Sequence, residues 1–228
     1  MRFDNLSEQD QSVFSQIASD RRNEIDERNE VAAAKIADAM AEHNADNPEF
    51  DDAENRQLIL EYLQNNPDAL YTYLVRGAVL QCRMATHIRK LNLPLCHAIY
   101  TGEIKHPIIH AEDAVPNENV MFFGHCHGTM GEQGDAETID LEMVSYDKDL
   151  LPSYTGTVKR GYKCNPQIID NQWQMTHRET RITRNGQPMS ESNAVESVTG
   201  ASFLMCRFGG LIEPLTSGQE NEETDPIG

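Results

Sequence analysis

Five cysteines are spread widely over the 228 residues of this chain, and no two of them form a Cys-x-x-Cys pair. A metal ion can tie thiolate and imidazole groups from separate segments together, at ligand distances of about 2.0–2.3 Å. An odd number of cysteines argues against a framework made of disulfides alone and leaves metal binding open. Each cysteine taken alone is more simply a small buried hydrophobe. A metal site is therefore indicated only if the fold brings several cysteines together.

An internal repeat indicates that four of the cysteines converge. The sequence GAVLQCR at residues 77–83 returns as GASFLMCR at 200–207, with one residue more before the cysteine. A hairpin-like unit ends 19 residues before Cys126, and a similar unit ends 18 residues before Cys206. Repeated hairpins that each deliver a cysteine favour a common meeting point, and the alternative is coincidence in a glycine-rich β protein. The predicted ligand set is Cys82, Cys126, Cys164 and Cys206.

Histidines form a second tier of candidate ligands, namely His97, His106, His125 and His127. In a β conformation His125 and His127 share one face while Cys126 points to the other. These three side chains cannot all bind one ion without a bulge. We expect one structural metal ion. Thiolate sites accept zinc or iron, and zinc is the favoured prediction.

Sequence motifs of catalysis are missing from the chain. It contains no HExxH, no glycine-rich phosphate loop, no Rossmann fingerprint and no nucleophile elbow that would expose a reactive cysteine. Acidic pairs such as Asp26-Glu27 read as solvated helix faces. We expect a protein that is not an enzyme, and a metal-dependent hydrolase using His125, His127 and a carboxylate is the least favoured alternative.

The overall charge limits the possible partners. The formal net charge is −18, and a chain this acidic repels phosphate backbones, so we expect no nucleic-acid partner. No apolar run approaches the roughly 18 residues that a membrane-spanning helix needs. The amino terminus lacks the apolar core of a secretory signal. We therefore expect cytoplasmic synthesis without a signal peptide, and a protein that is not integral to a membrane.

The amino-terminal part of the sequence predicts an acidic helical arm over residues 1–70, in which seventeen Asp and Glu stand against six Lys and Arg. Helical spacing of apolar residues predicts a helix over 7–43, and a second helix follows from residue 51 or 52 and ends before Pro67. The charged stretch 19–30 is expected to project into solvent or toward a partner.

Beyond the arm, alanine and glutamate give way to Val, Ile, Thr, Gly and Pro, which predicts a β domain over residues 72–219. Residues 129–150 show no clear strand period and are interpreted as a surface insertion, partly helical. Residues 220–228 are expected to form an acidic flexible tail. The predicted fold class is therefore mainly β, with an acidic helical arm in front.

Several segments of the β domain together resemble a PAAR-like domain of unknown function, which accompanies contractile injection systems such as type VI secretion and phage-tail-like particles. The most specific parts of this resemblance are CRFGGLI at 206–212 and SGQ at 217–219. Cys82 is followed by Arg-Met-Ala, where the family more often has a small-aromatic-glycine run. The remaining segments that carry the resemblance are 74–82, 122–126, 163–166, Trp173 and 185–188.

The resemblance implies a cone of β-hairpins whose wide base sits on a trimeric β-helical spike. Its apex would be sharpened by a metal ion on the four cysteines. It implies a non-enzymatic tip protein that is assembled into the injection particle and delivered extracellularly or into a target envelope. We expect the helical arm to recruit an effector or to contact baseplate or tube proteins. The alternative is a metal-stapled effector or toxin carrier that is secreted by another route.

Overall fold

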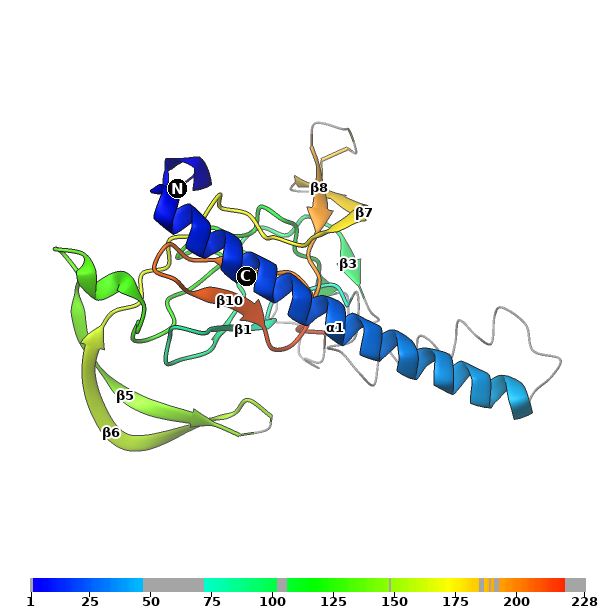
Figure 1. Cartoon of the computed structure of the whole chain (residues 1–228), viewed down its shortest axis with the longest axis horizontal. Helices are drawn as coiled ribbons and strands as arrows, with labels where there is room; N and C mark the ends of the chain where they lie inside the picture. The colour runs from blue at the N-terminus through cyan, green and yellow to red at the C-terminus, as the bar shows by residue number, and fades with distance from the viewer. Residues whose placement is uncertain are drawn as a thin grey trace.

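The computed structural model describes residues 2–46, 72–101, 106–147, 149–184, 187–188, 190 and 193–219. The described chain is mainly β, with one long amino-terminal helix laid across a body of small antiparallel hairpins (Figure 1). The predicted fold class is confirmed. The second predicted helix and the acidic tail lie outside the described residues, and the domain boundary near residue 71 stays a prediction.

The helix α1 spans Glu8–Asp46 and follows a 3-10 turn, η1, at Phe3–Asn5. Ser7 caps its start, because the Ser7 Oγ accepts a hydrogen bond from the Asp10 backbone N–H at 3.2 Å. The same hydroxyl donates to the Asp10 carboxylate at 2.7 Å. The helix predicted for residues 7–43 is thus confirmed to within a few residues.

One face of α1 packs on the body. The buried residues Phe14, Ala18, Arg21 and Ile25 are three or four positions apart and so lie along one stripe of the helix. The apolar members of this stripe meet a cluster from the body that includes Ile169, Ala201, Phe203, Met205 and Leu211. Residues 19–30 are expected from the sequence to project into solvent or toward a partner. Arg21 and Ile25 are instead buried on the body, whereas most other described charged side chains of the stretch are exposed, namely Asp20, Arg22, Glu24, Asp26, Glu27 and Glu30.

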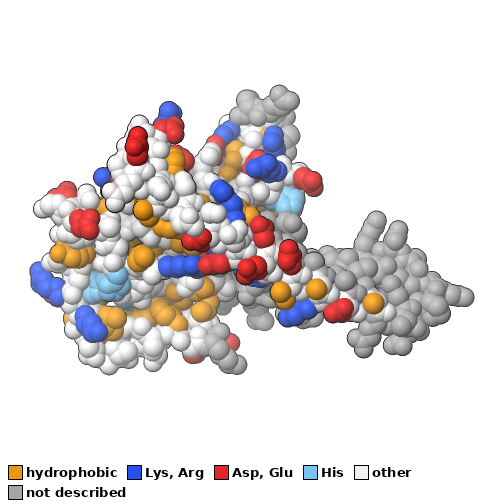
Figure 2. All heavy atoms as spheres, viewed as in Figure 1, with side chains coloured by type: hydrophobic (Ala, Val, Ile, Leu, Met, Phe, Trp, Pro, Cys, Tyr) orange, Lys and Arg blue, Asp and Glu red, His pale blue; other side chains and the backbone are white. Residues whose placement is uncertain are grey.

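An ion-pair network joins α1 to the central sheet. Glu213, on strand β10 (Leu211–Pro214), accepts from Arg21 Nη2 at 2.9 Å and from Arg83 Nε at 2.9 Å. Arg83 in turn contacts Glu24 at 2.8 Å, which closes the network back onto the helix. Figure 2 shows acidic side chains along the outward side of the helix, above a body with scattered apolar side chains.

The central sheet carries both copies of the internal repeat. Its strand order is β2-β1-β10-β9, and all neighbouring pairs are antiparallel. Ile212 of β10 faces Cys82 on one side and Leu204 on the other, so β1 and β9, the two repeat strands, flank the same partner. The remaining bounds are β1 Val79–Cys82, β2 Arg89–Lys90 and β9 Leu204–Met205.

Three two-stranded hairpins complete the body. The longest hairpin pairs β5 with β6 and forms a curved ribbon that stands apart from the sheet (Figure 1). The predicted insertion 129–150 contains a short 3-10 helix, η2, and all nine residues of β5, so its largest regular element is a strand. Its alternation breaks at a register shift between Glu142 and Val144, which obscures the period. The bounds are β3 Tyr100–Thr101, β4 His106–Pro107, η2 Thr129–Glu132, β5 Thr138–Tyr146, β6 Pro152–Tyr162, β7 His177–Thr183 and β8 Ala194–Ser197.

Within the part of the chain that the structure describes, no helix has the length and apolar character needed to cross a membrane.

Candidate functional site

Strand ends position the two repeat cysteines. Cys82 is the last residue of β1, and Cys206 follows β9 directly. The turn after β9 is closed by Cys206, whose backbone N–H donates to the Gly210 carbonyl at 2.7 Å. Because β1 and β9 flank β10, their cysteines emerge on the same side of the molecule.

The other two cysteines reach this place from the crossing segments. Cys126 pairs with Ala85 in a β-bridge, and its N–H donates to the Tyr162 carbonyl at 2.8 Å. Cys164 follows β6 and donates its N–H to the Gly124 carbonyl at 2.8 Å. All four cysteines therefore come from separate segments that backbone hydrogen bonds hold in place.

The four thiols form one buried electrostatic group. Burial raises the pKa of Cys82 to about 12, and the potential charges of Cys206, Cys164 and Cys126 raise it further. Burial likewise raises the pKa of Cys164 to about 12, with Cys126 and Cys206 adding to it. The pKa of Cys206 is raised by burial and by Cys126. All four cysteines belong to one buried cluster of the body, so the fold places them in the same part of the core.

Backbone N–H groups point at the sulfur atoms and favour their ionised form. The N–H of Met84 lowers the pKa of Cys82, and the N–H of Phe208 lowers that of Cys206. Each donor lies two residues after its cysteine, so the repeat reproduces the same contact. The Gln167 N–H also donates to Cys206 Sγ at 3.4 Å. Such donors stabilise thiolates, which are the form that binds metals.

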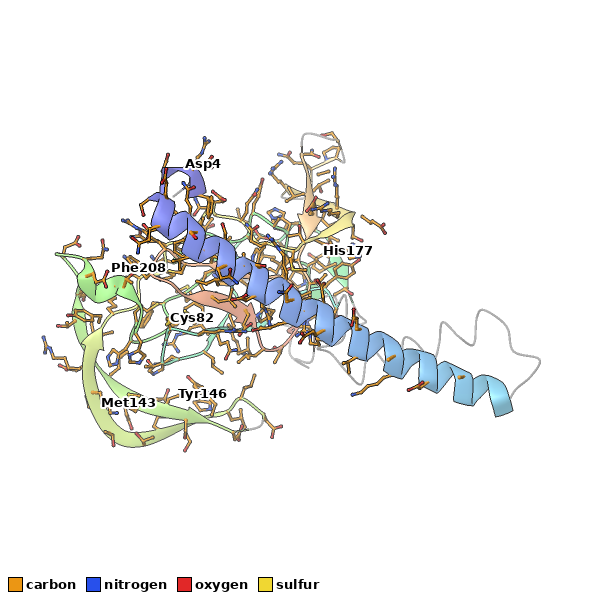
Figure 3. The ribbon with its side chains drawn as sticks, in the orientation of Figure 1. Asp4, Cys82, Met143, Tyr146, His177 and Phe208 are labelled. Carbon is orange, nitrogen blue, oxygen red and sulfur yellow. The ribbon has the colours of Figure 1, made fainter. Side chains whose placement is uncertain are left out.

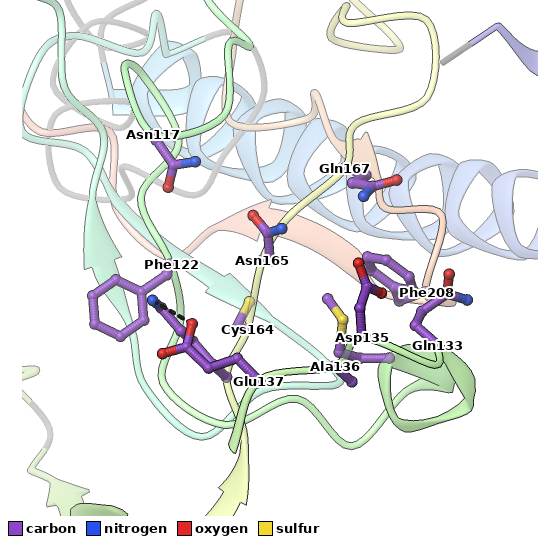
Figure 4. A pocket seen from close by; sticks show the side chains of 12 residues that line it. Asn117, Phe122, Gln133, Asp135, Ala136, Glu137, Cys164, Asn165, Gln167 and Phe208 are labelled. Atoms are coloured by element: carbon purple, nitrogen blue, oxygen red, sulfur yellow. Dashed lines mark hydrogen bonds and ion pairs between the residues drawn. The ribbon is translucent and has the colours of Figure 1, made fainter. Parts of the chain in front are cut away.

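The sulfur atoms are not drawn into a closed tetrahedron. Among the described residues, no three cysteine sulfurs all lie within 4.8 Å of one another. A tetrahedral zinc ion with sulfur ligands at about 2.3 Å needs sulfur–sulfur distances of about 3.8 Å. The donor set fits zinc or iron in chemistry, but the sulfurs would have to approach one another. A cavity of about 490 Å³ is lined in part by Cys164 (Figure 4).

A glycine leaves room for the cysteines at the end of the sheet. A Cβ added at Gly210 would lie 2.7 Å from Cys82 Sγ and 3.5 Å from Cys206 Cβ. We expect Gly210→Ala to displace the Cys82 thiol and to destabilise the fold by about 1–3 kcal/mol, as overpacking does. Urea unfolding measures this effect. Gly134→Ala is the matched control, because an added Cβ there has open space, and equal losses in the two variants would contradict the expectation.

Burial also predicts how the thiols react once metal has been removed. The thiolate is the nucleophile, so at pH 8 a thiol with a pKa near 12 reacts slowly with iodoacetamide. We expect Cys96, which is half-buried and outside the cluster, to be alkylated well before Cys82 and Cys164 in chelator-treated folded protein. Peptide mass spectrometry at successive times measures the order. Modification of Cys164 as fast as Cys96 would contradict the buried cluster.

The second-tier histidines are not gathered at the cysteines. The buried ring of His125 donates from Nε2 to the Ile139 carbonyl at 3.0 Å, whereas His127 is exposed. The two rings therefore do not share one environment. His106 lies buried on β4. Metal binding by any of these three stays a prediction.

His97 belongs to a different group. His97, His110 and Asp113 are buried, and one ligand atom from each lies within 4.8 Å of the others, so this group could hold a metal ion. Sequence reasoning treats His110, like His97, only as a lone second-tier histidine, and it does not propose Asp113 as a ligand. The spacing of three residues between His110 and Asp113 is typical of a turn that directs two side chains to one point, but it does not include His97. Figure 3 places Cys82 and Phe208 on the side of the body nearer the β5–β6 ribbon, away from His177 on β7.

A small domain of antiparallel hairpins that gathers four buried cysteines is the class of protein that the fold and the site define. Residues 74–219 match a family described as a domain of unknown function, DUF4280. The match covers more than half of the chain, and the protein belongs to this family. No curated protein and no solved structure matches it.

Proposed function

We propose that this protein is the non-enzymatic tip that caps the trimeric central spike of a contractile injection system. The observation that carries the proposal is the convergence of Cys82, Cys126, Cys164 and Cys206 from separate segments at one end of the central sheet. The resemblance to PAAR-like domains, stated from the sequence, supplies the spike as partner. The β-hairpin fold of the DUF4280 region supports the same interpretation.

A metal ion on the four cysteines would make this end of the domain rigid. Small β domains bury too little apolar surface to hold a narrow end by packing alone. When bound, the ion supplies cross-links between segments that otherwise share only a few hydrogen bonds. The chain itself contributes the burial and the N–H donors that hold the sulfurs in place. The piercing mechanism is then mechanical: sheath contraction drives the spike forward, and the tip concentrates the force.

The helix fits an additional role at the base of the tip. The first half of α1 is fixed to the body by its buried stripe, while its second half extends beyond the body (Figure 1). We propose that this extension and the rest of the arm contact an effector, the tube or the baseplate. Deletion of residues 1–70 tests the role, with particle assembly and cargo loading as readouts. Unchanged assembly and loading would refute it.

Binding to the spike is the direct test of the tip function. Purified full-length chain is mixed with the trimeric spike encoded beside it, and native mass spectrometry measures the stoichiometry. We expect one chain per spike trimer. Absence of binding, together with a gene neighbourhood without sheath and tube genes, would instead favour the effector carrier. The hydrolase alternative has no support from the arrangement of its two histidines, because His125 is buried and His127 is exposed.

A further inference from the structure

We propose that His97, His110 and Asp113 form a second metal site, separate from the cysteine cluster, which takes a divalent transition-metal ion such as Zn²⁺. Two imidazoles and one carboxylate are a ligand set typical of zinc and of related first-row ions. This site does not depend on the proposed tip function or on metal binding by the cysteines.

The Asp113 carboxylate is the centre of the group. Its Oδ2 lies 2.9 Å from His97 Nε2 and 3.3 Å from His110 Nδ1. Nitrogen and oxygen ligands about 2.0–2.1 Å from a tetrahedral ion are about 3.3–3.4 Å apart. The donor atoms around Asp113 are therefore already spaced to within a few tenths of an ångström of what an ion requires.

Two neighbours of His110 Nδ1 make opposite demands on the protonation of that nitrogen. The Glu112 backbone N–H points at His110 Nδ1 at 3.2 Å, which requires a lone pair on that nitrogen. The same nitrogen faces a carboxylate oxygen of Asp113 at 3.3 Å, which favours a proton there. No single protonation state satisfies both contacts. A metal ion accepts a lone pair from the nitrogen and from the carboxylate, so these two atoms no longer repel, and the Glu112 N–H gives up its contact with Nδ1.

The burial of the Asp113 carboxylate favours the binding of a cation beside it. His97, His110 and Asp113 are 3%, 4% and 6% exposed, and a buried carboxylate is costly unless a cation or several donors compensate it. Among the residues that the structure describes, the ion-pair partners of Asp113 are the two histidines. The nearby Arg184 pairs with Glu112 instead. The His110 backbone N–H also donates to Asp113 Oδ2 at 2.8 Å, and an ion would add positive charge to these contacts.

The surrounding chain holds the ligands in place. The indole of Trp173 donates to the Asp113 carbonyl at 3.0 Å, and the Asp113 N–H donates to the His110 carbonyl at 3.0 Å. His110 also bridges to Ser197 at the end of β8, beside His177. Ala98, directly after His97, has a φ of 61°, a conformation that costs a non-glycine residue about 1 kcal/mol or more.

Binding requires one local adjustment. The His97 and His110 rings are stacked, with centroids 3.9 Å apart and planes 22° from parallel. Their in-plane lone pairs cannot meet at one ion until one ring turns about its soft χ2 torsion. The proton on His97 Nε2 must also leave that nitrogen, so metal binding is expected to weaken as the pH falls.

Cobalt(II) titration of the full-length protein tests the site. Co²⁺ bound by thiolates gives strong sulfur-to-metal charge-transfer absorption, whereas a site made of imidazole and carboxylate gives only weak d–d bands. We use a Cys126→Ser/Cys164→Ser background, which weakens the cysteine cluster, and measure bound metal by plasma mass spectrometry after gel filtration. One equivalent of Co²⁺ without charge-transfer absorption is the expected result.

Substitutions within the group assign that equivalent. We expect Asp113→Asn and His110→Gln each to weaken its binding by at least about 100-fold, and His127→Gln, which changes an exposed imidazole, to leave it unchanged. Circular dichroism first establishes that each variant is folded. Two separate single substitutions are made, so that one remains informative if the other does not fold. No nitrogen- and oxygen-bound cobalt in the background protein, or equal retention in folded Asp113→Asn, overturns the proposal. Failure of the cysteine cluster to bind metal leaves it standing.

Discussion

Replacement of Cys164 by serine should remove the tightly bound metal of the cysteine cluster and lower the unfolding temperature by about 10 °C or more. A structural zinc site contributes a large part of the folding free energy of a small domain, of order 10 kcal/mol in zinc-finger peptides. Loss of only 3–5 kcal/mol corresponds to roughly 10 °C in a chain of this size, at about 2–4 °C per kcal/mol. Plasma mass spectrometry of purified protein and thermal unfolding measure the two losses together.

The size of the effect separates a metal ligand from a merely buried thiol. Without metal, Cys164→Ser places a hydroxyl where burial disfavours it, which costs about 1–3 kcal/mol. Chelator-treated wild-type protein gives the metal-free reference, and Cys96→Ser is the matched control outside the cluster. Wild-type protein that contains no stoichiometric metal would remove the proposed metal-sharpened apex. The hairpin fold would remain, and disulfide formation among the cysteines would be the next question.

The convergence of the cysteines could be predicted because it follows from a repeat. The two copies that end in Cys82 and Cys206 became β1 and β9, and both pair with β10. Equivalent strands on either side of one partner deliver equivalent residues to one end. The separations of the sulfur atoms could not be predicted, because they depend on how tightly the crossing segments with Cys126 and Cys164 pack on that sheet.

The histidine–aspartate group could not be found from sequence spacing. His97 lies thirteen residues before His110, in a stretch that predicts only a hairpin. The group exists because the turn from His110 to Asp113 is held against β8 and Trp173, which are more than sixty residues further along the chain. Contacts of that sequence separation leave no local pattern to recognise.

The docking face of the helix was missed for a different reason. Phe14, Ala18 and Ile25 form an apolar stripe at helical spacing, but Arg21 interrupts it within a run of charged residues. A charged residue at such a position usually marks the solvent face. Here Arg21 pairs with Glu24 on its own helix and with Glu213 on β10, and the second pairing could not be known before the strand was placed.

Substitution of Glu213 by alanine should therefore destabilise the attachment of the helix more than any exposed charge would. The side chains of Arg21 and Glu213 are 10% and 6% exposed and lie 2.9 Å apart. Removal of Glu213 leaves buried Arg21 with only the half-exposed Glu24, 3.1 Å away, as its partner. We expect a loss toward the lower end of the about 3–5 kcal/mol that a broken buried pair costs. We expect urea unfolding to show this loss and limited proteolysis to cut α1 sooner. Asp140→Asn is the matched control, because Asp140 and Arg160 are mostly exposed and such pairs contribute at most about 1 kcal/mol.

A second substitution distinguishes the buried charge from the loss of side-chain packing. In Arg21→Met/Glu213→Ala the uncompensated guanidinium is gone, while the methionine still fills much of the space along the stripe. We expect the double variant to recover at least half of the stability that Glu213→Ala loses, since a buried ion pair often contributes little beyond an apolar replacement. The Arg83–Glu24 pair is present in both variants, whereas the Arg21–Glu24 pair at 3.1 Å is lost in the double variant, which works against the recovery. If the two losses simply add, the contact between Arg21 and Glu213 is not what fixes the helix, and the apolar stripe around Ile25 must hold it alone.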